Sequence, residues 1–227
     1  MLSRVLEPEV MDTVEEAIDY DSMDHNTVNR LFVDHLLTAA RDVGVVSHTE
    51  LQILDVGTGT ALIPIELCRR LQTGRVRAID LAAEMLKLAR ANIARAGLTA
   101  RIEPELIDAK TLPYPDASFD WVISNSIIHH IPDPSLCLSE MRRVLKPGGL
   151  LFVRDLFRPD SAEAIEHIVQ TYAGGDSARQ QQLFRQSLHA ALTVEEMRDL
   201  AESLGLRRDS VNASSDRHWT LALRPPA

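Results

Sequence analysis

The stretch Leu51-Gln52-Ile53-Leu54-Asp55-Val56-Gly57-Thr58-Gly59-Thr60-Ala61 sets the fold class of this chain. Its first six residues are typical of a buried strand, with an acid, Asp55, near the strand's end. Gly57 and Gly59 then allow a sharp backbone turn and leave room for a ligand to lie against bare main chain. A helix pattern follows at once over 61–70, and the free N–H groups of its first turn point back at the glycines. The stretch therefore predicts a nucleotide-type binding turn.

Strands and helices alternate after this turn, which predicts an α/β fold. Strand patterns cover 51–56, 75–80, 100–107, 119–124 and 150–154, with helix patterns between them. Such alternation gives right-handed crossovers and a Rossmann-like, mostly parallel sheet with helices on both faces. Because Pro104 lacks an N–H, its strand is expected at an edge of that sheet.

The N-terminal part and one later stretch depart from the alternation. Residues from about 5 to 42 show amphipathic helical patterns with a polar break at 20–26. We therefore expect an N-terminal helical cap or lid over 1–45 and a main domain over 46–227. Two more helix patterns, separated by glycines, predict a helical insertion at about 158–192 within that domain.

The last part of the chain predicts a helix and a hairpin. Thr193 is expected to cap a helix over 194–204, because acids occupy its first turn and a glycine follows its end. Two strand-like runs, 209–213 and 219–224, are joined by a short polar turn. They predict an antiparallel pair of strands.

The composition excludes several classes of protein. Of the 227 residues 45% are hydrophobic, and the formal net charge of −9 argues against bulk electrostatic binding of nucleic acid. No apolar run approaches the roughly 18 residues that cross a bilayer, and the N-terminus turns acidic before a signal-peptide core can form, so we expect a cytoplasmic protein. The two cysteines, Cys68 and Cys137, are expected to be buried thiols; we predict neither a disulfide framework nor a metal site.

The residues around the glycine turn restrict the class of ligand that it can bind. Leu62 stands where a dinucleotide-binding turn has its third glycine, and the turn lacks the lysine of a phosphate-binding loop. A ligand with a nucleoside but no pyrophosphate remains. Asp80 ends the second strand, where it can accept from both ribose hydroxyls, and Asp108 ends the third, where it can accept from an adenine amino group. Asp55 would face an amine.

With these residues in view, the chain resembles the class I S-adenosylmethionine-dependent methyltransferases, specifically the type 11 small-molecule group related to the ubiquinone/menaquinone C-methyltransferases. The resemblance covers about 50–155. It rests on Leu54–Thr60, Ala78-Ile79-Asp80 with Met85 and Ala89, Leu112–Asp120, Ser126–Pro134 and Glu140–Gly149. The short stretch Tyr20-Asp21-Ser22-Met23 is similar to one that covers the cofactor in the quinone-related enzymes.

The resemblance implies a cofactor, a fold and a set of binding residues. The cofactor would be S-adenosyl-L-methionine, in a seven-stranded sheet whose last strand is antiparallel. Its methionine part would lie at the glycine turn and its ribose at Asp80, with Leu81 packing at the adenine. The implied cofactor-binding residues are Tyr20, Met23, Asp55, Gly57, Thr58, Gly59, Thr60, Asp80, Leu81, Met85, Asp108, Ala109, Asn125 and Ser126.

Candidates for the chemistry follow from the strand ends. Because the cofactor is already a strong electrophile, the protein must mainly align a nucleophile with its methyl group and exclude water. His129 and His130 follow the fourth strand and Asp155 the fifth, so these three are the candidate catalytic residues. The alternative is that the histidines only orient a loop or contact the cofactor.

A second polar group suggests how an acceptor could be held. Arg154, Arg158 and Arg217 could grip an anionic acceptor through forked hydrogen bonds, beside His218 and Trp219. The alternative is a surface network in which the arginines pair with Asp155, Asp160 and Asp216.

The sequence therefore predicts a methyl transfer from S-adenosylmethionine to a small-molecule acceptor, with anionic acceptors among the candidates. Three alternatives stay open: a quinone-type C-methyltransferase, a protein that binds S-adenosylmethionine without transferring methyl groups, and, more distantly, a nicotinamide oxidoreductase. The acceptor atom and the oligomeric state also stay open.

Overall fold

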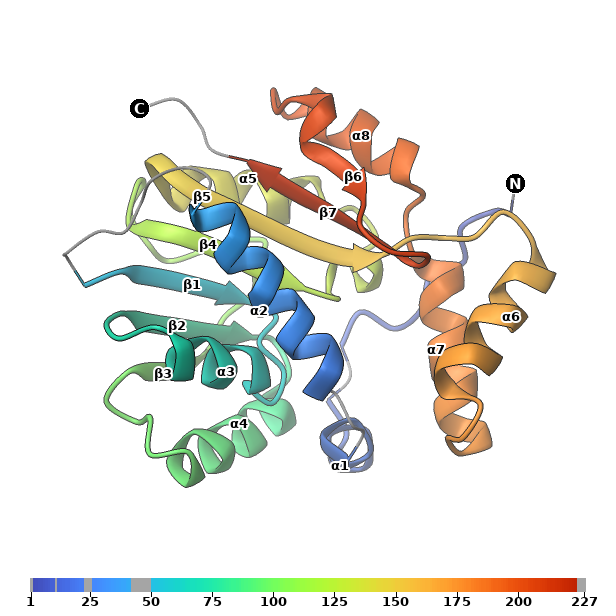
Figure 1. The fold of residues 1–227 in the computed structure, drawn as a ribbon, viewed down its shortest axis with the longest axis horizontal. Helices are drawn as coiled ribbons and strands as arrows, with labels where there is room; N and C mark the ends of the chain where they lie inside the picture. Colours follow the sequence, from blue (N-terminus) through green and yellow to red (C-terminus); the bar gives the residue numbers. More distant parts are fainter. Residues whose placement is uncertain (1, 11, 23–25, 42–49, 224–227) are drawn as a thin grey trace. The chain divides into compact units, whose positions relative to one another are not determined.

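The computed structural model describes residues 2–10, 12–22, 26–41 and 50–223. They form a seven-stranded sheet in the order β3-β2-β1-β4-β5-β7-β6 (Figure 1). The strands are β1 (Gln52–Val56), β2 (Arg75–Asp80), β3 (Ile102–Leu106), β4 (Phe119–Asn125), β5 (Leu145–Leu156), β6 (Val211–Ala213) and β7 (His218–Leu223). β1 pairs in parallel with β2 and β4, whereas β6 and β7 pair antiparallel. The predicted fold class and terminal hairpin are confirmed.

The chain divides into two compact units, which we describe separately. The first unit comprises Met1–Glu9, Ser126–Ser135 and Arg154–Leu221. The second unit comprises Val10–Asn125, Leu136–Val153 and Ala222–Ala227. The glycine turn lies in the second unit, and the two candidate histidines lie in the first.

The second unit has one large apolar core around the parallel strands. Its helices are α1 (Val14–Ser22), α2 (Asn26–Arg41), α3 (Leu62–Arg70), α4 (Ala83–Arg95) and most of α5 (Ser135–Val144). Phe32 and Leu36 of α2 are fully buried against the strands, and the Phe32 ring meets Phe152 edge to face at 5.2 Å. Each such side chain contributes about 1.5–3 kcal/mol on burial. This core holds the carboxyl ends of β1 and β2 in place.

Two details of the strands follow from single residues. Pro104 lies in β3, which pairs with β2 and ends the strand order, so the predicted edge position is confirmed. β5 begins at Leu145, earlier than the expected strand at 150–154. Gly149 lies so close to the Asp120 carbonyl that an added Cβ would stand 2.7 Å from it. Residues 146–149 are thus part of β5.

The helices of the first unit begin at well-formed caps. They are α6 (Ala162–Ala173), α7 (Ala178–Ala190) and α8 (Val194–Ser203), with the short turns η1 (Ile128–His130) and η2 (Arg208–Ser210). Ser177 and Thr193 each form a reciprocal capping box with the residue three positions on. The predicted cap at Thr193 is confirmed. Buried Ile165, Val169 and Leu188 join α6 to α7 in a small core.

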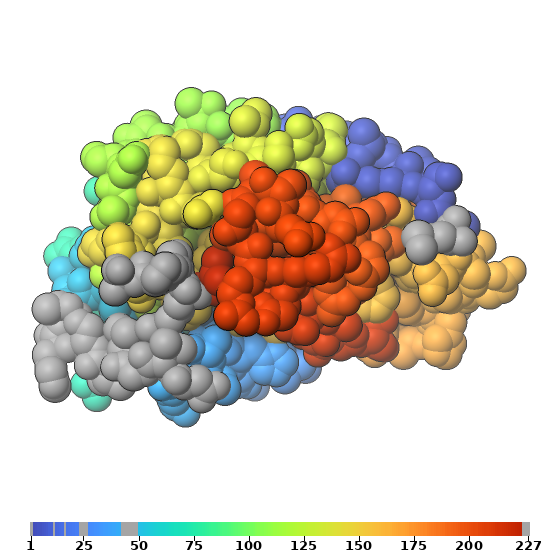
Figure 2. All heavy atoms as spheres, turned by 90° about the horizontal axis from the view of Figure 1, so that it is seen from above, coloured from blue at the N-terminus to red at the C-terminus, as the bar shows by residue number. Residues whose placement is uncertain are grey.

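The surface of α8 is acidic, and its carboxylates pair with nearby arginines. Arg208 of η2 pairs with Glu195 at 2.7 Å and also with Asp199 and Glu202. Figure 2 shows this part of the surface in orange-red. Exposed pairs of this kind stabilise a protein by only about 0–1 kcal/mol each.

The first residues of the chain form no helix, so the helical prediction for 5–10 is wrong. They lie across the first unit, held by main-chain acceptors. Arg4 donates to the carbonyls of Ala190 and Ile131 at 2.6 and 3.0 Å, and the Val5 N–H donates to the His189 carbonyl at 3.1 Å. These tertiary contacts override the amphipathic pattern. No helix among the described residues is long and apolar enough to cross a membrane.

Candidate active site

The glycine turn is tied to the end of the neighbouring strand. Gly57 and Gly59 have positive φ angles, 74° and 54°, which a side chain would strain. The N–H groups of Gly57 and Thr58 both donate to the Ile79 carbonyl at 2.9 Å. The Gly59 N–H donates to Oδ2 of Asp80 at 2.7 Å. These bonds fix the turn against the carboxyl end of β2.

Asp55, on β1, is a buried acid with an unused oxygen. Its side chain is almost fully buried, and Oδ2 has no hydrogen-bond partner among the described residues. Burial raises the pKa of Asp55 to about 7; the nearby Thr58 hydroxyl opposes this rise, and the charge of Asp80 adds to it. A buried carboxylate without a partner is costly unless a cation meets it. The site is therefore built to receive a positively charged group.

Asp80 is placed to serve both the turn and a ligand. Its Oδ1 accepts from the Ala82 N–H at 2.9 Å, and its Oδ2 is bound to Gly59 as described. Burial raises the pKa of Asp80, and these backbone bonds oppose the shift. Because each carboxylate oxygen can accept two hydrogen bonds, capacity remains for hydroxyl donors.

Tyr20 of α1 lies over the glycine turn. A Cβ built on Gly59 would stand 3.6 Å from Cε1 of Tyr20. Burial, then the charges of Asp80 and Asp55, raises the pKa of Tyr20 to about 12, so its phenol stays neutral. Asn92 of α4 links α1 to the turn, because it donates to Asp21 at 2.9 Å and to the Thr60 carbonyl at 3.1 Å.

The remaining predicted cofactor residues of the second unit have varied surroundings. Met85 is buried beside Ala17 of α1, and Leu81 is 40% exposed. Asp108 accepts from the Lys110 N–H at 2.9 Å and is partly exposed, as is Ala109. Thr58, Thr60 and Asn125 have buried side-chain oxygens without partners among the described residues. Met23 lies outside the described residues.

Three residues other than glycine adopt left-handed backbone angles in the described part of the chain: Ala61, Ala117 and Ser126. Ala61 has φ 63° just before α3, and Ser126, in the first unit, has φ 59° and donates its N–H to the Arg154 carbonyl at 2.9 Å. Such conformations cost roughly 1–3 kcal/mol and cluster at functional sites. Ala61 ends the glycine turn of the second unit, and Ser126 directly follows β4.

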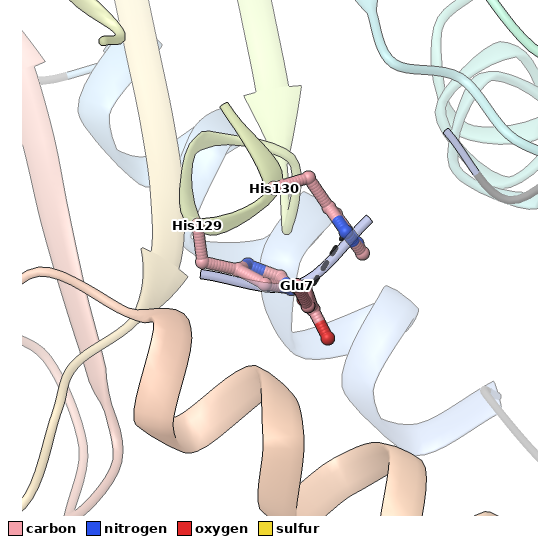
Figure 3. Close-up of side chains that lie close together, drawn as sticks. All are labelled: Glu7, His129 and His130. Atoms are coloured by element: carbon pink, nitrogen blue, oxygen red, sulfur yellow. Dashed lines mark ion pairs between the residues drawn. The ribbon is translucent and has the colours of Figure 1, made fainter. Parts of the chain in front are cut away.

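The candidate catalytic residues of the first unit do meet. A fourth side chain, Glu7, joins the two histidines (Figure 3). Nδ1 of His129 lies 2.5 Å from Oδ1 of Asp155. Its Nε2 lies 3.4 Å from Oε1 of Glu7, and Nδ1 of His130 lies 3.1 Å from the same oxygen. Sequence reasoning missed Glu7, because no motif surrounds it and its segment was predicted to be helical.

The charges in this group are strongly coupled. Burial acts to lower the pKa of His129, but the Asp155 carboxylate and then Glu7 raise it above its ordinary value. Burial acts to raise the pKa of Asp155, but the charge and hydrogen bond of His129 hold it below its usual range. His129 and Asp155 thus form a buried ion pair. Burial, then the charge of His129, lowers the pKa of His130 to about 3.

The structure counts against two predicted acceptor-binding residues. Arg158 is buried, and its guanidinium donates to the carbonyls of Leu2 and Ala191 at 2.9 and 2.6 Å and to Glu196 at 2.6 Å. Each of the three guanidinium nitrogens of Arg158 thus donates to a group of the protein. Trp219 is 0% exposed and belongs to the core. These contacts weigh against a role of either residue in binding an acceptor, and that role stays a prediction.

The other three predicted acceptor residues are partly engaged. Arg154 is buried and donates from Nε to Oγ1 of Thr220 at 3.1 Å; burial lowers its pKa to about 10. Arg217 pairs with Asp216 at 3.0 Å and lies over the Tyr172 ring. His218 contacts Ser215 at 2.8 Å, and burial lowers its pKa to about 4. The pairing of Arg217 with Asp216 is the one that the surface-network alternative predicts.

Comparisons with known proteins agree with this geometry. The family profile described as "Methyltransferase domain" matches residues 54–153. A demethylmenaquinone methyltransferase of Deinococcus radiodurans is 38% identical over 136 residues, which cover 60% of this chain and 56% of that protein. A ubiquinone/menaquinone biosynthesis C-methyltransferase of a Marinomonas species is 31% identical over 122 residues, 53% of this chain and 48% of that one. The chain thus spans about half the length of these relatives.

A solved structure has the same fold. The crystal structure of a SAM-dependent methyltransferase from Aquifex aeolicus superimposes with a TM-score of 0.64 at 20% identity, over 92% of this chain and 97% of that one. At this identity the likeness concerns the fold. Together with the family match, it confirms the predicted resemblance. Residues 54–153 thus match the family described as a methyltransferase domain, and the chain shares its fold with a SAM-dependent methyltransferase of known structure.

Proposed function

We propose that this chain transfers a methyl group from S-adenosylmethionine to a small-molecule acceptor. The observation that carries the proposal is the buried Oδ2 of Asp55, which has no hydrogen-bond partner in the described part of the chain and stands beside the glycine turn. The ammonium group of the methionine part would supply the missing cation. The sulfonium then lies close to the turn, and neither a dinucleotide nor a nucleoside triphosphate offers a cation at that place.

Each part of the cofactor has a proposed partner in the second unit. Asp80 accepts the ribose hydroxyls with the lone pairs that Gly59 and Ala82 leave free. Asp108 accepts from the adenine amino group, and Ala109, Leu81 and Met85 contact the base. Tyr20 covers the turn, and its neutral phenol avoids adding charge near the sulfonium. Asn125 is proposed at the methionyl end, whereas the role of Ser126, a residue of the first unit, stays a prediction from the sequence.

Methyl transfer needs little from a general base. The carbon–sulfur bond of the sulfonium breaks as the acceptor's electron pair forms the new bond, and S-adenosylhomocysteine leaves as a neutral thioether. The protein contributes alignment and exclusion of water. His129, His130 and Asp155 stay the proposed groups that orient the acceptor.

A quinone-type C-methylation is the second candidate, because two relatives at 38% and 31% identity carry such names. The protein contacts of Arg158 and the burial of Trp219 weigh against an anionic acceptor. Arg154, Arg217 and His218 remain as its proposed contacts. We propose a small molecule rather than a nucleic acid because the formal net charge is −9. A cytoplasmic location stays a prediction from the sequence.

The test combines binding with turnover. Calorimetry with S-adenosylmethionine should show one site, and incubation with a panel of demethylated quinones, phenols and carboxylic acids should release S-adenosylhomocysteine. Binding without release across the panel would favour a binding protein without transferase activity. No binding of S-adenosylmethionine would overturn the proposal.

A further inference from the structure

We propose that Glu7, His129 and His130 bind a divalent transition-metal ion, with zinc as the expected occupant. The three side chains meet in the first unit, and one ligand atom from each lies within 4.8 Å of the other two (Figure 3). The inference does not depend on the proposed methyl transfer. It departs from the expectation of no metal site, because Glu7 is unrecognisable in the sequence.

The distances fit a coordination shell. Two atoms bound to one zinc ion at about 2.1 Å stand roughly 3.0–3.4 Å apart, whether the geometry is octahedral or tetrahedral. Oε1 of Glu7 is 3.4 Å from Nε2 of His129 and 3.1 Å from Nδ1 of His130. The distances from Glu7 to the two histidines are thus already those expected between two ligands of one ion. A small rotation of the two imidazoles, whose centroids are 4.2 Å apart, brings the third distance, between the two histidine nitrogens, into the same range.

His129 has a carboxylate behind its ring, as metal-binding histidines commonly do. Its Nδ1 lies 2.5 Å from the Asp155 carboxylate, which fixes the ring and leaves Nε2 as the nitrogen that faces Glu7. The His129 N–H also donates to Asp155 at 3.1 Å, so backbone and ring are held by one carboxylate. A carboxylate behind a metal-binding imidazole orients the ring and strengthens it as a ligand.

His130 presents an unsatisfied nitrogen to the same point. Its Nδ1 is buried and has no hydrogen-bond partner among the described residues. The ring does bond to the backbone of Pro8. Proline has no N–H, so the imidazole is the donor there, and Nε2 must carry that proton. A lone pair on Nδ1 therefore faces a carboxylate oxygen 3.1 Å away. Two facing acceptors need a cation between them, either a proton or a metal ion.

Charge and ligand type favour a transition metal. Glu7 and Asp155 bring two carboxylates, and Arg4, which bonds to nearby carbonyls, brings one opposing charge. Imidazole nitrogens select zinc, copper, nickel and iron over magnesium and calcium. Two histidines and one glutamate are also the protein ligands of open zinc sites, which keep a fourth position for water or another oxygen ligand.

The ligands are held before an ion arrives. Glu7 accepts from the Ser187 hydroxyl at 3.3 Å. Its segment is fixed by the main-chain bonds of Arg4 and Val5. The side chains of Glu7 and His129 are only 9% and 4% exposed. A preformed, nearly dry site loses little freedom on binding, which favours affinity.

The test is a zinc titration of the full chain after chelator treatment and dialysis. Calorimetry should show one site of micromolar or tighter affinity, and cobalt should give visible absorption bands of a nitrogen- and oxygen-bound ion. Glu7→Gln and His130→Ala should each weaken zinc binding at least tenfold, and Asp155→Asn about 10- to 100-fold. The matched changes Glu163→Gln and His167→Ala, at exposed positions of α6, should leave affinity unchanged.

Two results would overturn the proposal. One is the absence of saturable zinc or cobalt binding by the wild-type chain, which would mean that only a proton lies between Glu7 and His130. The other is binding that persists in the double variant Glu7→Gln/His130→Ala, which would assign it to another site. Should the variants not fold, a zinc-soaked crystal of the wild type decides: the anomalous peak must lie between these three side chains. Failure of methyl transfer alone leaves each of these readouts unchanged.

Discussion

Nδ1 of His129 lies 2.5 Å from Oδ1 of Asp155, and the two side chains are only 4% and 1% exposed. A buried pair of this kind is costly to break, because the partner left behind keeps an uncompensated charge. Asp155→Asn should therefore lower the free energy of unfolding of the metal-free protein by roughly 3 kcal/mol. Urea denaturation at pH 7 measures it.

The matched control removes an ion pair on the surface. Asp199→Asn breaks the exposed pair with Arg208, and its effect should stay within about 1 kcal/mol. Equal losses in the two variants would show that burial does not strengthen the His129–Asp155 pair.

The raised pKa of Asp55 predicts how the free energy of unfolding changes with pH. Its pKa is about 7 in the folded protein and 3.8 ordinarily, so the folded state holds a proton that the unfolded chain releases between these values. The free energy of unfolding must therefore fall as pH rises from about 4 to 7. Asp55→Asn should remove this fall and stabilise the ligand-free protein at pH 8, as thermal unfolding at several pH values would show.

The same substitution should harm binding. An amide cannot pair with the ammonium of S-adenosylmethionine, so affinity should drop roughly 10- to 100-fold. In the wild type, affinity should fall as pH decreases below 7, because the carboxyl takes up its proton. A variant that is both more stable and fully able to bind would refute the proposed role of Asp55.

Asp80 tests the ribose assignment. Asp80→Ala removes the acceptor of the Gly59 N–H as well as the proposed hydroxyl partner, so affinity for S-adenosylmethionine should fall roughly 10- to 100-fold by calorimetry. Asp116→Ala, at a side chain that is 79% exposed, should leave affinity unchanged. Unchanged affinity in Asp80→Ala would show the assignment to be wrong.

Arg158 should behave as a structural residue. Lysine cannot replace a guanidinium that donates to two carbonyls and a carboxylate at once, so Arg158→Lys should lower the free energy of unfolding by about 2 kcal/mol. Arg207→Lys, at an exposed ion pair, should change it by less than 1 kcal/mol. Once a substrate is known, a large rise in KM without a loss of stability in Arg158→Lys would return this residue to the acceptor site.

The parts that could be predicted from the sequence are those that depend on local pattern. Asp55, Asp80 and the two glycines are fixed by the strand–turn–helix pattern, and Pro104 marks an edge strand because it lacks an N–H. Glu7 could not be predicted, since its position depends on the bonds of Arg4 and Val5 to residues more than a hundred positions away. The contacts of Arg158 could not be predicted for the same reason, because two of its partners are main-chain carbonyls, which every residue carries.

Alanine substitutions at Gly59 and Gly97 separate the effect of the backbone conformation from the effect of a side chain beside Tyr20. Gly59 and Gly97 both have positive φ, 54° and 70°, so alanine at either position should cost roughly 1–2 kcal/mol of stability. Only the Cβ at Gly59 meets another residue, Tyr20 at 3.6 Å; the one at Gly97 has nothing within 4 Å. Gly97→Ala should therefore keep its affinity for S-adenosylmethionine. Gly59→Ala, with a methyl group where the ligand is proposed to lie, should lose at least tenfold, and equal affinities in calorimetry would place the cofactor away from this turn.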